Sequence, residues 1–578
     1  MAASALALPL VVSPATADNY FLPKLAAARA VVIGLLLITG VAAVMGRLRL
    51  RRTPLDIPLA FFVVSALVSM IFAVNTNLAI FGSYTRYEGF LTILLYSLLF
   101  WLAVQALDGV SNAVIVVRAL LGAAFLVSLV GILQVAFGSL VGPGPAETGF
   151  AFGGVLRGYA TFGNPNALGA FLAMLLPIAV WEMLAARSAS GRLLSANVIA
   201  VLTLGLLLTF SRSAWAGAAI GVTAVLLATT RLRWAAVAAS TRVRWTVLVV
   251  SALVALLLVG VQLAPPAGSP TIVNAAVSRL RSIEAPLATS SGQFRLQVWR
   301  DTLALIASRP FFGYGPDTFG LVYPRFQTAH GEASVIIDRA HTAPLDVAAT
   351  QGLVGLFAYA ALLLAMVRAF LKRRHDLQSV ALFGGFLSYE TYTLLNFSYL
   401  PAALPFWLFM AAAVTVWSPP TWVPIRGRAP ALAGIIVVAT ALLLVIPAVS
   451  APFQADLTYK TALDAAAKGR RDEARNLVES ARSLAPYQST YAVAAGSLAL
   501  DLSADGRPAP DADWSAARAA FLAASRLGTF NSAAYRNLAI ADAALGRRQE
   551  AIAAAQMAVQ LNRFDPANQA ELASLRSR

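Results

Sequence analysis

Long apolar runs separated by short polar segments dominate the first 450 or so residues of the chain. A membrane-spanning helix needs about 20 predominantly apolar residues, and each run is close to that length. The sequence predicts an all-α, polytopic membrane protein of about 12 transmembrane helices, followed by an external α-helical domain. The predicted spans lie near 25–46, 55–74, 89–107, 113–139, 166–186, 194–210, 213–230, 246–264, 344–371, 378–396, 400–417 and 430–451.

One arginine interrupts a long apolar stretch. Between Arg192 and Arg231 the only charged residue is Arg212, in the sequence TFSRSAW. A charge at the bilayer centre costs about 2.5–3.5 kcal/mol on insertion scales. The stretch is too long for one span and about right for two. The sequence therefore places Arg212 at the turn 211–213, at a membrane face.

The Lys and Arg residues of the short loops predict the orientation, because cytoplasmic loops are enriched in both. With these spans, all the basic clusters fall on one side, which is therefore predicted to be cytoplasmic. The clusters occupy 47–52, 187–192, 231–244, 372–374 and 426–428. The external segments are then 75–88, 140–165, 211–213, 265–342 and everything after 452.

The predicted domains are an N-terminal segment over 1–23, a transmembrane domain over 24–452 with a long external loop at 265–342, and a tail over 455–578. The N-terminal segment is apolar but short, so we expect either a half-span or the remainder of a first helix. No basic region precedes it, which disfavours a cleaved signal peptide.

The tail is charged, Ala-rich and amphipathic, and it contains an internal repeat. The sequence GRRDEA at 469–474 recurs as GRRQEA at 546–551. Leu527 and Leu561 are 34 residues apart, which is the tetratricopeptide period. The segment 501–513 has the character of a loop insertion. We predict about three helix-turn-helix repeats; the alternative is a generic Ala-rich helical bundle.

The composition excludes several kinds of functional site. Only 12% of residues are charged and 59% are hydrophobic, as expected for a membrane protein. The absence of cysteine excludes disulfides and thiol chemistry, and three histidines are too few for a His-rich metal or haem site. Glu88, Glu182 and Glu390, within or beside the spans, form no paired set. We therefore expect no metal, no cofactor and no nucleic-acid partner.

Several arginines lie in predicted external segments, contrary to the positive-inside bias. Arginine binds phosphate oxygens with pairs of hydrogen bonds, so these side chains predict an anion site at the outer face. The obvious anion there is a lipid-linked phosphate or diphosphate. Alternatively, each arginine caps a helix C-terminus or reaches towards headgroups. The arginines are Arg86, Arg157, Arg212, Arg295 and Arg300.

His341 lies at the end of the long external segment, at the start of the next predicted helix. A neutral imidazole can accept a proton from a sugar hydroxyl near neutral pH. The alternative is a structural histidine at a helix N-terminus, which is the only role we assign to His330 and His375. Asn164 and Pro165 suit the cap and first turn of a helix, whose N-terminus can also bind an anion.

Five segments in order resemble the O-antigen ligase and polymerase superfamily of membrane glycosyltransferases. The resemblance covers roughly 80–360, and the hydrophobic scaffold extends it to about 450. The tail resembles the tetratricopeptide domains fused to one branch of that family. The segments are SYTRYEG, Arg157 through TFGNPN, LTFSRSAW, Arg295-x-x-x-Trp299 followed by RPFFGYGPDTF, and AHTAPLDVAATQGLVG.

The resemblance implies a reaction. Members transfer a glycan from undecaprenyl diphosphate to an acceptor hydroxyl at the outer face of the bacterial cytoplasmic membrane, with inversion and without metal or nucleotide. Arg212 and Arg295 match arginines that hold the diphosphate, and His341 matches the histidine that activates the acceptor. As further substrate-binding residues we expect Arg86, Arg157, Asn164 and Arg300.

The acceptor and the function class stay open at this point. Glycan, lipid and protein acceptors share one donor and one set of motifs, so the sequence does not separate ligase, polymerase and protein glycosyltransferase. The repeat tail favours a protein acceptor or partner over a lipid A-core acceptor. A flippase without chemistry of its own would carry polar residues deep in its spans. A membrane-anchored scaffold, in which only the tail acts, would leave the external arginines unexplained.

Overall fold

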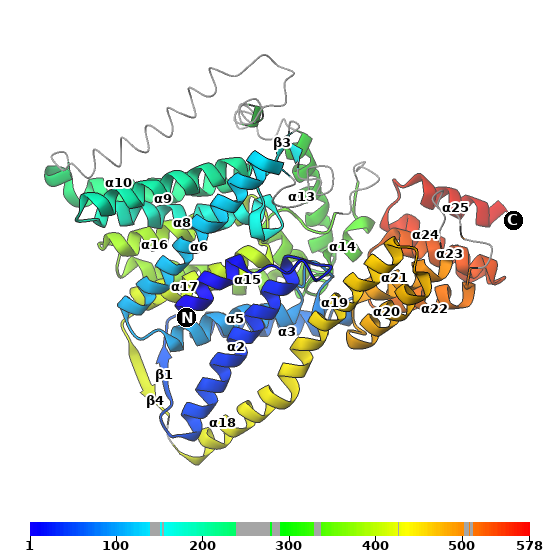
Figure 1. Ribbon diagram of the computed structural model, residues 1–578, viewed down its shortest axis with the longest axis horizontal. Helices are drawn as coiled ribbons and strands as arrows, with labels where there is room; N and C mark the ends of the chain where they lie inside the picture. The colour runs from blue at the N-terminus through cyan, green and yellow to red at the C-terminus, as the bar shows by residue number, and fades with distance from the viewer. Residues whose placement is uncertain are drawn as a thin grey trace.

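The computed structural model describes residues 1–138, 151–152, 155–237, 275, 278–279, 290–328, 337–425, 427–501, 508 and 512–577. These residues form a helical bundle and a group of tail helices at one end of it (Figure 1). His330, Arg426, the predicted span 246–264 and part of the predicted loop 265–342 lie outside the described residues.

The helices of the bundle follow the predicted spans. Seven described helices are long and apolar enough to cross a membrane, and shorter apolar helices lie at 56–71, 90–106 and 428–443. An all-α polytopic membrane protein is thus confirmed, whereas the number of spans stays a prediction. The main helices are α1 (Ala2–Leu10), α2 (Phe21–Val44), α3 (Asp56–Ile71), α4 (Thr76–Phe81), α5 (Phe90–Ala106), α6 (Val110–Phe137), α8 (Pro165–Ala185), α9 (Ala189–Leu208), α10 (Arg212–Val237), α13 (Ser290–Ser308), α14 (Phe319–Val322), α15 (Ala343–Leu371), α16 (Leu377–Leu394), α17 (Leu400–Trp417) and α18 (Arg428–Thr440).

Two helices form the centre of the bundle. Every residue of α17 is buried, and α8 is buried along most of its length. Small residues allow close packing around them. A Cβ added to Gly221 in α10 would lie 2.3 Å from the carbonyl oxygen of Gly384 in α16. Such contacts between small residues are typical of helices that associate within a membrane. They fix the start of α10, which carries Arg212, beside the end of α16.

The structure adds two short antiparallel pairs that the all-α prediction omitted. β1 (Arg49–Arg52) pairs with β4 (Thr421–Pro424), and β2 (Ala151–Phe152) pairs with β3 (Val155–Leu156). Arg51 in β1 is only 1% exposed, and its guanidinium donates to three main-chain carbonyls. The alternation RLRLR at 47–51 has the two-residue period of a strand, so this sequence pattern could have indicated β1.

Helix α15 differs from the single span predicted over 344–371 because it is kinked at Gly352, where φ is +70°. The segment 310–315 packs against the kink. The amide of Leu353 donates to the carbonyl of Pro310 (2.7 Å), and the amide of Gly315 donates to the carbonyl of Thr350 (2.8 Å). The Gly-rich sequence RPFFGYG is therefore a structural element, which satisfies main-chain groups that the kink leaves free.

The tail consists of antiparallel helix pairs. The GRRDEA and GRRQEA sequences begin at equivalent turns, where Gly469 and Gly546 have φ of +73° and +72°. This arrangement is that of helix-turn-helix repeats, while the tetratricopeptide assignment stays a prediction. Most of the predicted insertion 501–513 lies outside the described residues. The helices are α19 (Ile446–Ala467), α20 (Arg471–Leu484), α21 (Ser489–Leu500), α22 (Trp514–Arg526), α23 (Ser532–Ala544), α24 (Arg548–Leu561) and α25 (Pro566–Ser577).

Tail and bundle are in direct contact. The side chain of Asn77 donates to the carbonyls of Tyr487 (2.9 Å) and Leu527 (3.0 Å). The hydroxyl of Tyr84, in the SYTRYEG segment, donates to Asp456 in α19 (2.5 Å). The tail therefore packs on the end of the bundle where the SYTRYEG segment lies.

Candidate functional site

Four arginines come together near the starts of α8, α10 and α13, and we call Arg157, Arg212, Arg279 and Arg295 the arginine cluster. Arg157 precedes α8, Arg212 is the first residue of α10, and Arg295 lies in the first half of α13. Burial, together with the positive charges of the other three arginines, lowers the pKa of Arg279 to about 10. The four guanidinium groups are thus close enough to repel one another.

The turn between α9 and α10 orients two of these arginines. The Nε of Arg157 donates to the carbonyl of Thr209 (2.8 Å), and the Nε of Arg279 donates to the carbonyl of Phe210 (2.9 Å). Phe210 has φ of +50°, a left-handed conformation that turns the chain sharply here. A further nitrogen of Arg157 donates to the side chain of Asn166 (2.9 Å). Burial lowers the pKa of Arg157 to about 10.

Arg295 differs from Arg157 and Arg279 in its contacts. Its guanidinium has no hydrogen bond or ion pair with any residue in the described part of the chain. Burial, and then the charge of Arg212, lower its pKa. A partly buried guanidinium with free donors is suited to bind phosphate oxygens.

His341 lies beside the arginine cluster, in a strained conformation with φ of +58°. The ring centroids of Phe294 and Phe397 lie 5.5 Å and 5.3 Å from that of the imidazole, and both rings meet it edge to face. Burial, and then the charge of Arg295, lower the pKa of His341 to about 4, although Asp338 opposes them. The imidazole is therefore neutral at pH 7 and can accept a proton.

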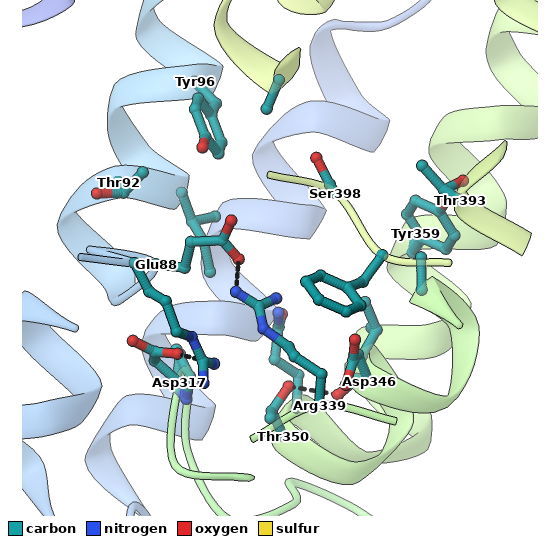
Figure 2. Close-up of a pocket in the computed structure, with 18 of the residues that line it drawn as sticks. Glu88, Thr92, Tyr96, Asp317, Arg339, Asp346, Thr350, Tyr359, Thr393 and Ser398 are labelled. Atoms are coloured by element: carbon teal, nitrogen blue, oxygen red, sulfur yellow. Dashed lines mark hydrogen bonds and ion pairs between the residues drawn. The ribbon is translucent and has the colours of Figure 1, made fainter. Parts of the chain in front are cut away.

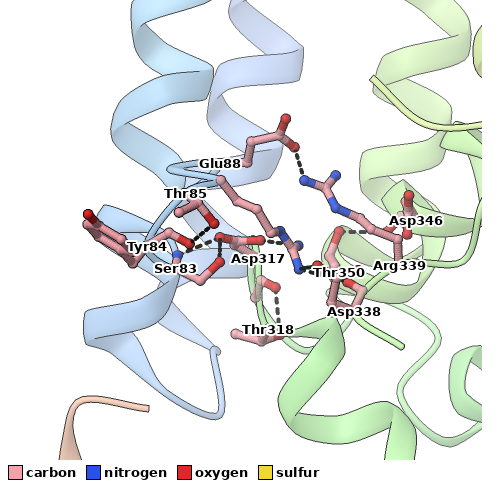
Figure 3. A network of polar contacts seen from close by, with 12 residues as sticks. Ser83, Tyr84, Thr85, Glu88, Asp317, Thr318, Asp338, Arg339, Asp346 and Thr350 are labelled. Atoms are coloured by element: carbon pink, nitrogen blue, oxygen red, sulfur yellow. Dashed lines mark hydrogen bonds and ion pairs between the residues drawn. The ribbon is translucent and has the colours of Figure 1, made fainter. Parts of the chain in front are cut away.

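Arg86, predicted to bind substrate, has a different environment. Its guanidinium forms ion pairs with Asp317 and with Asp338 (2.6 Å), as Figure 3 shows for the surrounding network. Asp317 also accepts a hydrogen bond from the amide of Ser83 (2.7 Å). These contacts hold the SYTRYEG and GYGPDTF segments together. Two carboxylates thus already pair with the guanidinium of Arg86, and its role in substrate binding stays a prediction.

The remaining predicted residues have separate positions. Asn164 caps α8 by accepting a hydrogen bond from the amide of Asn166 (2.8 Å), as its structural interpretation predicted. Arg300 is exposed and five positions after Arg295 in α13, which places it on another face of the helix. The structure does not bring Arg300 to the arginine cluster, so its substrate-binding prediction lacks geometric support.

Sequence reasoning missed Arg279. It lies in the predicted external loop 265–342 and belongs to none of the segments that carried the resemblance. The only signal was another arginine on the external side. As for metals, no three His, Asp or Glu side chains converge within the described residues. The side chains that the structure brings together here supply guanidinium groups and a neutral imidazole.

Fold and site define a helical membrane protein with a partly buried arginine cluster and an adjacent neutral histidine. Residues 196–360 match the protein family described as O-antigen ligase. This range contains three arginines of the cluster, Arg212, Arg279 and Arg295, together with His341. No curated protein matches the chain. The chain is thus similar to membrane enzymes that transfer glycans in polysaccharide assembly.

Proposed function

We propose that the protein transfers a glycan from an undecaprenyl-diphosphate carrier to an acceptor hydroxyl at the outer face of the cytoplasmic membrane. The observation that supports this most is the juxtaposition of the arginine cluster with the neutral His341. A leaving group with two phosphates requires several positive charges, and an attacking hydroxyl requires a base. The family match supports the same class of reaction.

In the proposed mechanism, the arginine cluster binds the diphosphate oxygens. The acceptor hydroxyl attacks the anomeric carbon from the opposite face while His341 takes its proton. The bond from that carbon to the diphosphate oxygen breaks, and its electron pair leaves with the diphosphate. Arg212 and Arg295 stabilise the charge that develops there, in a site where low dielectric strengthens the interaction. The bound diphosphate offsets the charge of Arg295 and so raises the pKa of His341, which makes it a better base.

We further propose that residues 455–578 form an external repeat domain that binds a protein partner or acceptor. Contacts of the tail with Asn77 in α4 and with Tyr84 in the SYTRYEG segment support its location on the same side as the site. Paired helices form the concave surfaces on which repeat proteins bind peptides. If deletion of 455–578 changed neither acceptor choice nor complex formation, this part of the proposal would be wrong.

The test is glycan transfer by the purified protein from a lipid-diphosphate donor in EDTA. Wild type is compared with Arg212→Ala, Arg295→Ala and His341→Ala, and Arg300→Ala is the matched control. We expect transfer that collapses in the first three variants and persists in the control. The acceptor that becomes labelled distinguishes ligase, polymerase and protein glycosylation. If no acceptor is labelled while donor crosses liposome membranes, the protein is a flippase and the proposal fails.

A further inference from the structure

A second site lies next to His341, on the other side of the ring of Phe397. A cavity of about 180 Å³ lies between α5, α15, α16 and α17, with Arg86, Glu88 and Arg339 among its lining residues (Figure 2). A cavity of about 150 Å³ accommodates a benzene ring, so this one can hold a single six-membered ring. We propose that it binds a sugar ring of the acceptor, an inference that rests on the proposed function.

Polar atoms without partners point to a ligand in this cavity. Asp346 and Gln351 are only 8% and 5% exposed, and both line it. Among the described residues, no hydrogen bond reaches the Oδ2 of Asp346, the Oε1 of Gln351 or the hydroxyl of Tyr96. Buried polar atoms are normally satisfied, because an unmade hydrogen bond costs free energy. Two acceptors and a hydroxyl around one space fit a ligand with several hydroxyl groups.

The walls of the cavity are aromatic. Rings of Phe62, Tyr359, Phe397, Phe406 and Trp407 line it. A sugar ring has an apolar C–H face and polar hydroxyl edges, so it can pack on aromatic rings while its hydroxyls bond to carboxylate and amide oxygens. Apolar walls with a few inward polar groups are therefore the environment that a pyranose needs.

The charges of the cavity exclude other ligand classes. Its two arginines form ion pairs, Arg339 with Glu88 (2.5 Å) and Arg86 with Asp317, and the Nε of each has no hydrogen-bond partner among the described residues. An anion would therefore meet an unpaired carboxylate oxygen at Asp346 and guanidinium charges that carboxylates already balance, whereas the two free Nε–H groups can donate to the hydroxyl oxygens of a neutral ligand. An alkyl chain would leave the buried polar atoms unsatisfied. A neutral polyol ring avoids both costs.

Phe397 connects the cavity to His341. Its ring lines the cavity, and its centroid lies 5.3 Å from the centroid of the His341 ring. The Cζ of Arg339 lies over the same ring, 5.0 Å from its centroid. The amide of Ala340, next to His341, donates to Asp346 (2.7 Å). In this proposal a sugar ring in the cavity lies next to His341, while the diphosphate lies at the arginine cluster. His341 is then close to both the donor and the acceptor subsites.

Kinetics test the proposal with Tyr96→Phe, which removes only an unpartnered hydroxyl, and with the isosteric Thr92→Val. Loss of one hydrogen bond to the sugar raises the acceptor KM about three- to tenfold and leaves the donor KM unchanged. Tyr87→Phe is the matched control, because its hydroxyl is also buried without a partner among the described residues but does not line the cavity. We expect wild-type kinetics from it. An unchanged acceptor KM in both cavity variants would overturn the proposal.

A binding measurement keeps this inference separate from the proposed function. The chain has no cysteine, so Thr92→Cys introduces a single thiol into the cavity wall. Methyl pyranosides should slow its modification by a small methanethiosulfonate reagent, whereas sorbitol and pyrophosphate should not. If transfer depends on the arginines but no pyranoside protects this thiol, the cavity inference alone fails. If pyranosides protect the thiol but the wild-type protein transfers no glycan, the proposed function fails instead.

Discussion

The coupling of Arg295 to His341 gives the sharpest prediction. The pKa of His341 is lowered from 6.5 to about 4, mainly by burial and then by the charge of Arg295. This difference corresponds to about 3.4 kcal/mol, at about 1.4 kcal/mol for each pH unit. Burial is the larger cause, and the charge of Arg295 is the second. We expect Arg295→Gln to raise the pKa of His341 by about 0.5–1.

The measurement is a ¹⁵N-histidine NMR titration of the full chain in nanodiscs. The chain has only three histidines, so His330→Gln and His375→Gln leave His341 as the single probe, with an affinity tag that lacks histidine. Arg300→Gln is the matched control, because this arginine is exposed on another face of α13. A wild-type pKa near 6.5 would refute the burial argument, and an unchanged value in Arg295→Gln would refute the coupling.

The same lowered pKa predicts acid sensitivity. The folded state disfavours protonated His341, whereas the unfolded chain accepts the proton near pH 6.5. The stability that His341 contributes is therefore present above pH 6.5 and is lost as the pH falls towards about 4, to a limit of about 3 kcal/mol. His341→Gln should lose less thermal stability than wild type between pH 7 and pH 5. An equal loss in both proteins would contradict this reasoning.

Two further predictions concern the scaffold. Gly352→Ala should lower the free energy of unfolding by about 1–3 kcal/mol or more, because the backbone φ at this position is +70° and an added Cβ would lie 2.2 Å from the carbonyl oxygen of Phe311. Gly34→Ala is the control in thermal unfolding, because no atom lies within 4 Å of the added Cβ there. Glu88→Gln leaves Arg339 buried without its carboxylate and should cost about 3–5 kcal/mol, and adding Arg339→Met should recover much of the loss. Equal stability of the single and double variants would argue against the ion pair.

The helices were predictable because apolar runs of span length have few alternatives in a membrane. The position of Arg212 at the start of α10 followed from the same length argument. The environment of Arg86 did not, because its partner Asp317 is separated from it by 231 residues. The kink at Gly352 depends on the distant segment 310–315, and no local pattern in α15 reveals it. Contacts between segments far apart in sequence thus account for most of what sequence reasoning missed.

In the arginine cluster, the stability of the unliganded protein and the binding of an anion make opposite demands on Arg295, and this can be tested. Burial and the charge of Arg212 lower the pKa of Arg295, so the charged guanidinium is unfavourable in the folded protein without an anion. Arg295→Gln removes that charge without breaking any hydrogen bond to a described residue, and should therefore raise the melting temperature of the unliganded protein. A ligand at 100 times its Kd stabilises by about 2.7 kcal/mol. A short polyprenyl diphosphate should stabilise wild type in this way and Arg295→Gln much less, since a hydrogen bond to a charged group is worth about 1.5–3 kcal/mol. If the variant were less stable without ligand and equally stabilised by the diphosphate, Arg295 would be a structural residue and the anion site would lie elsewhere.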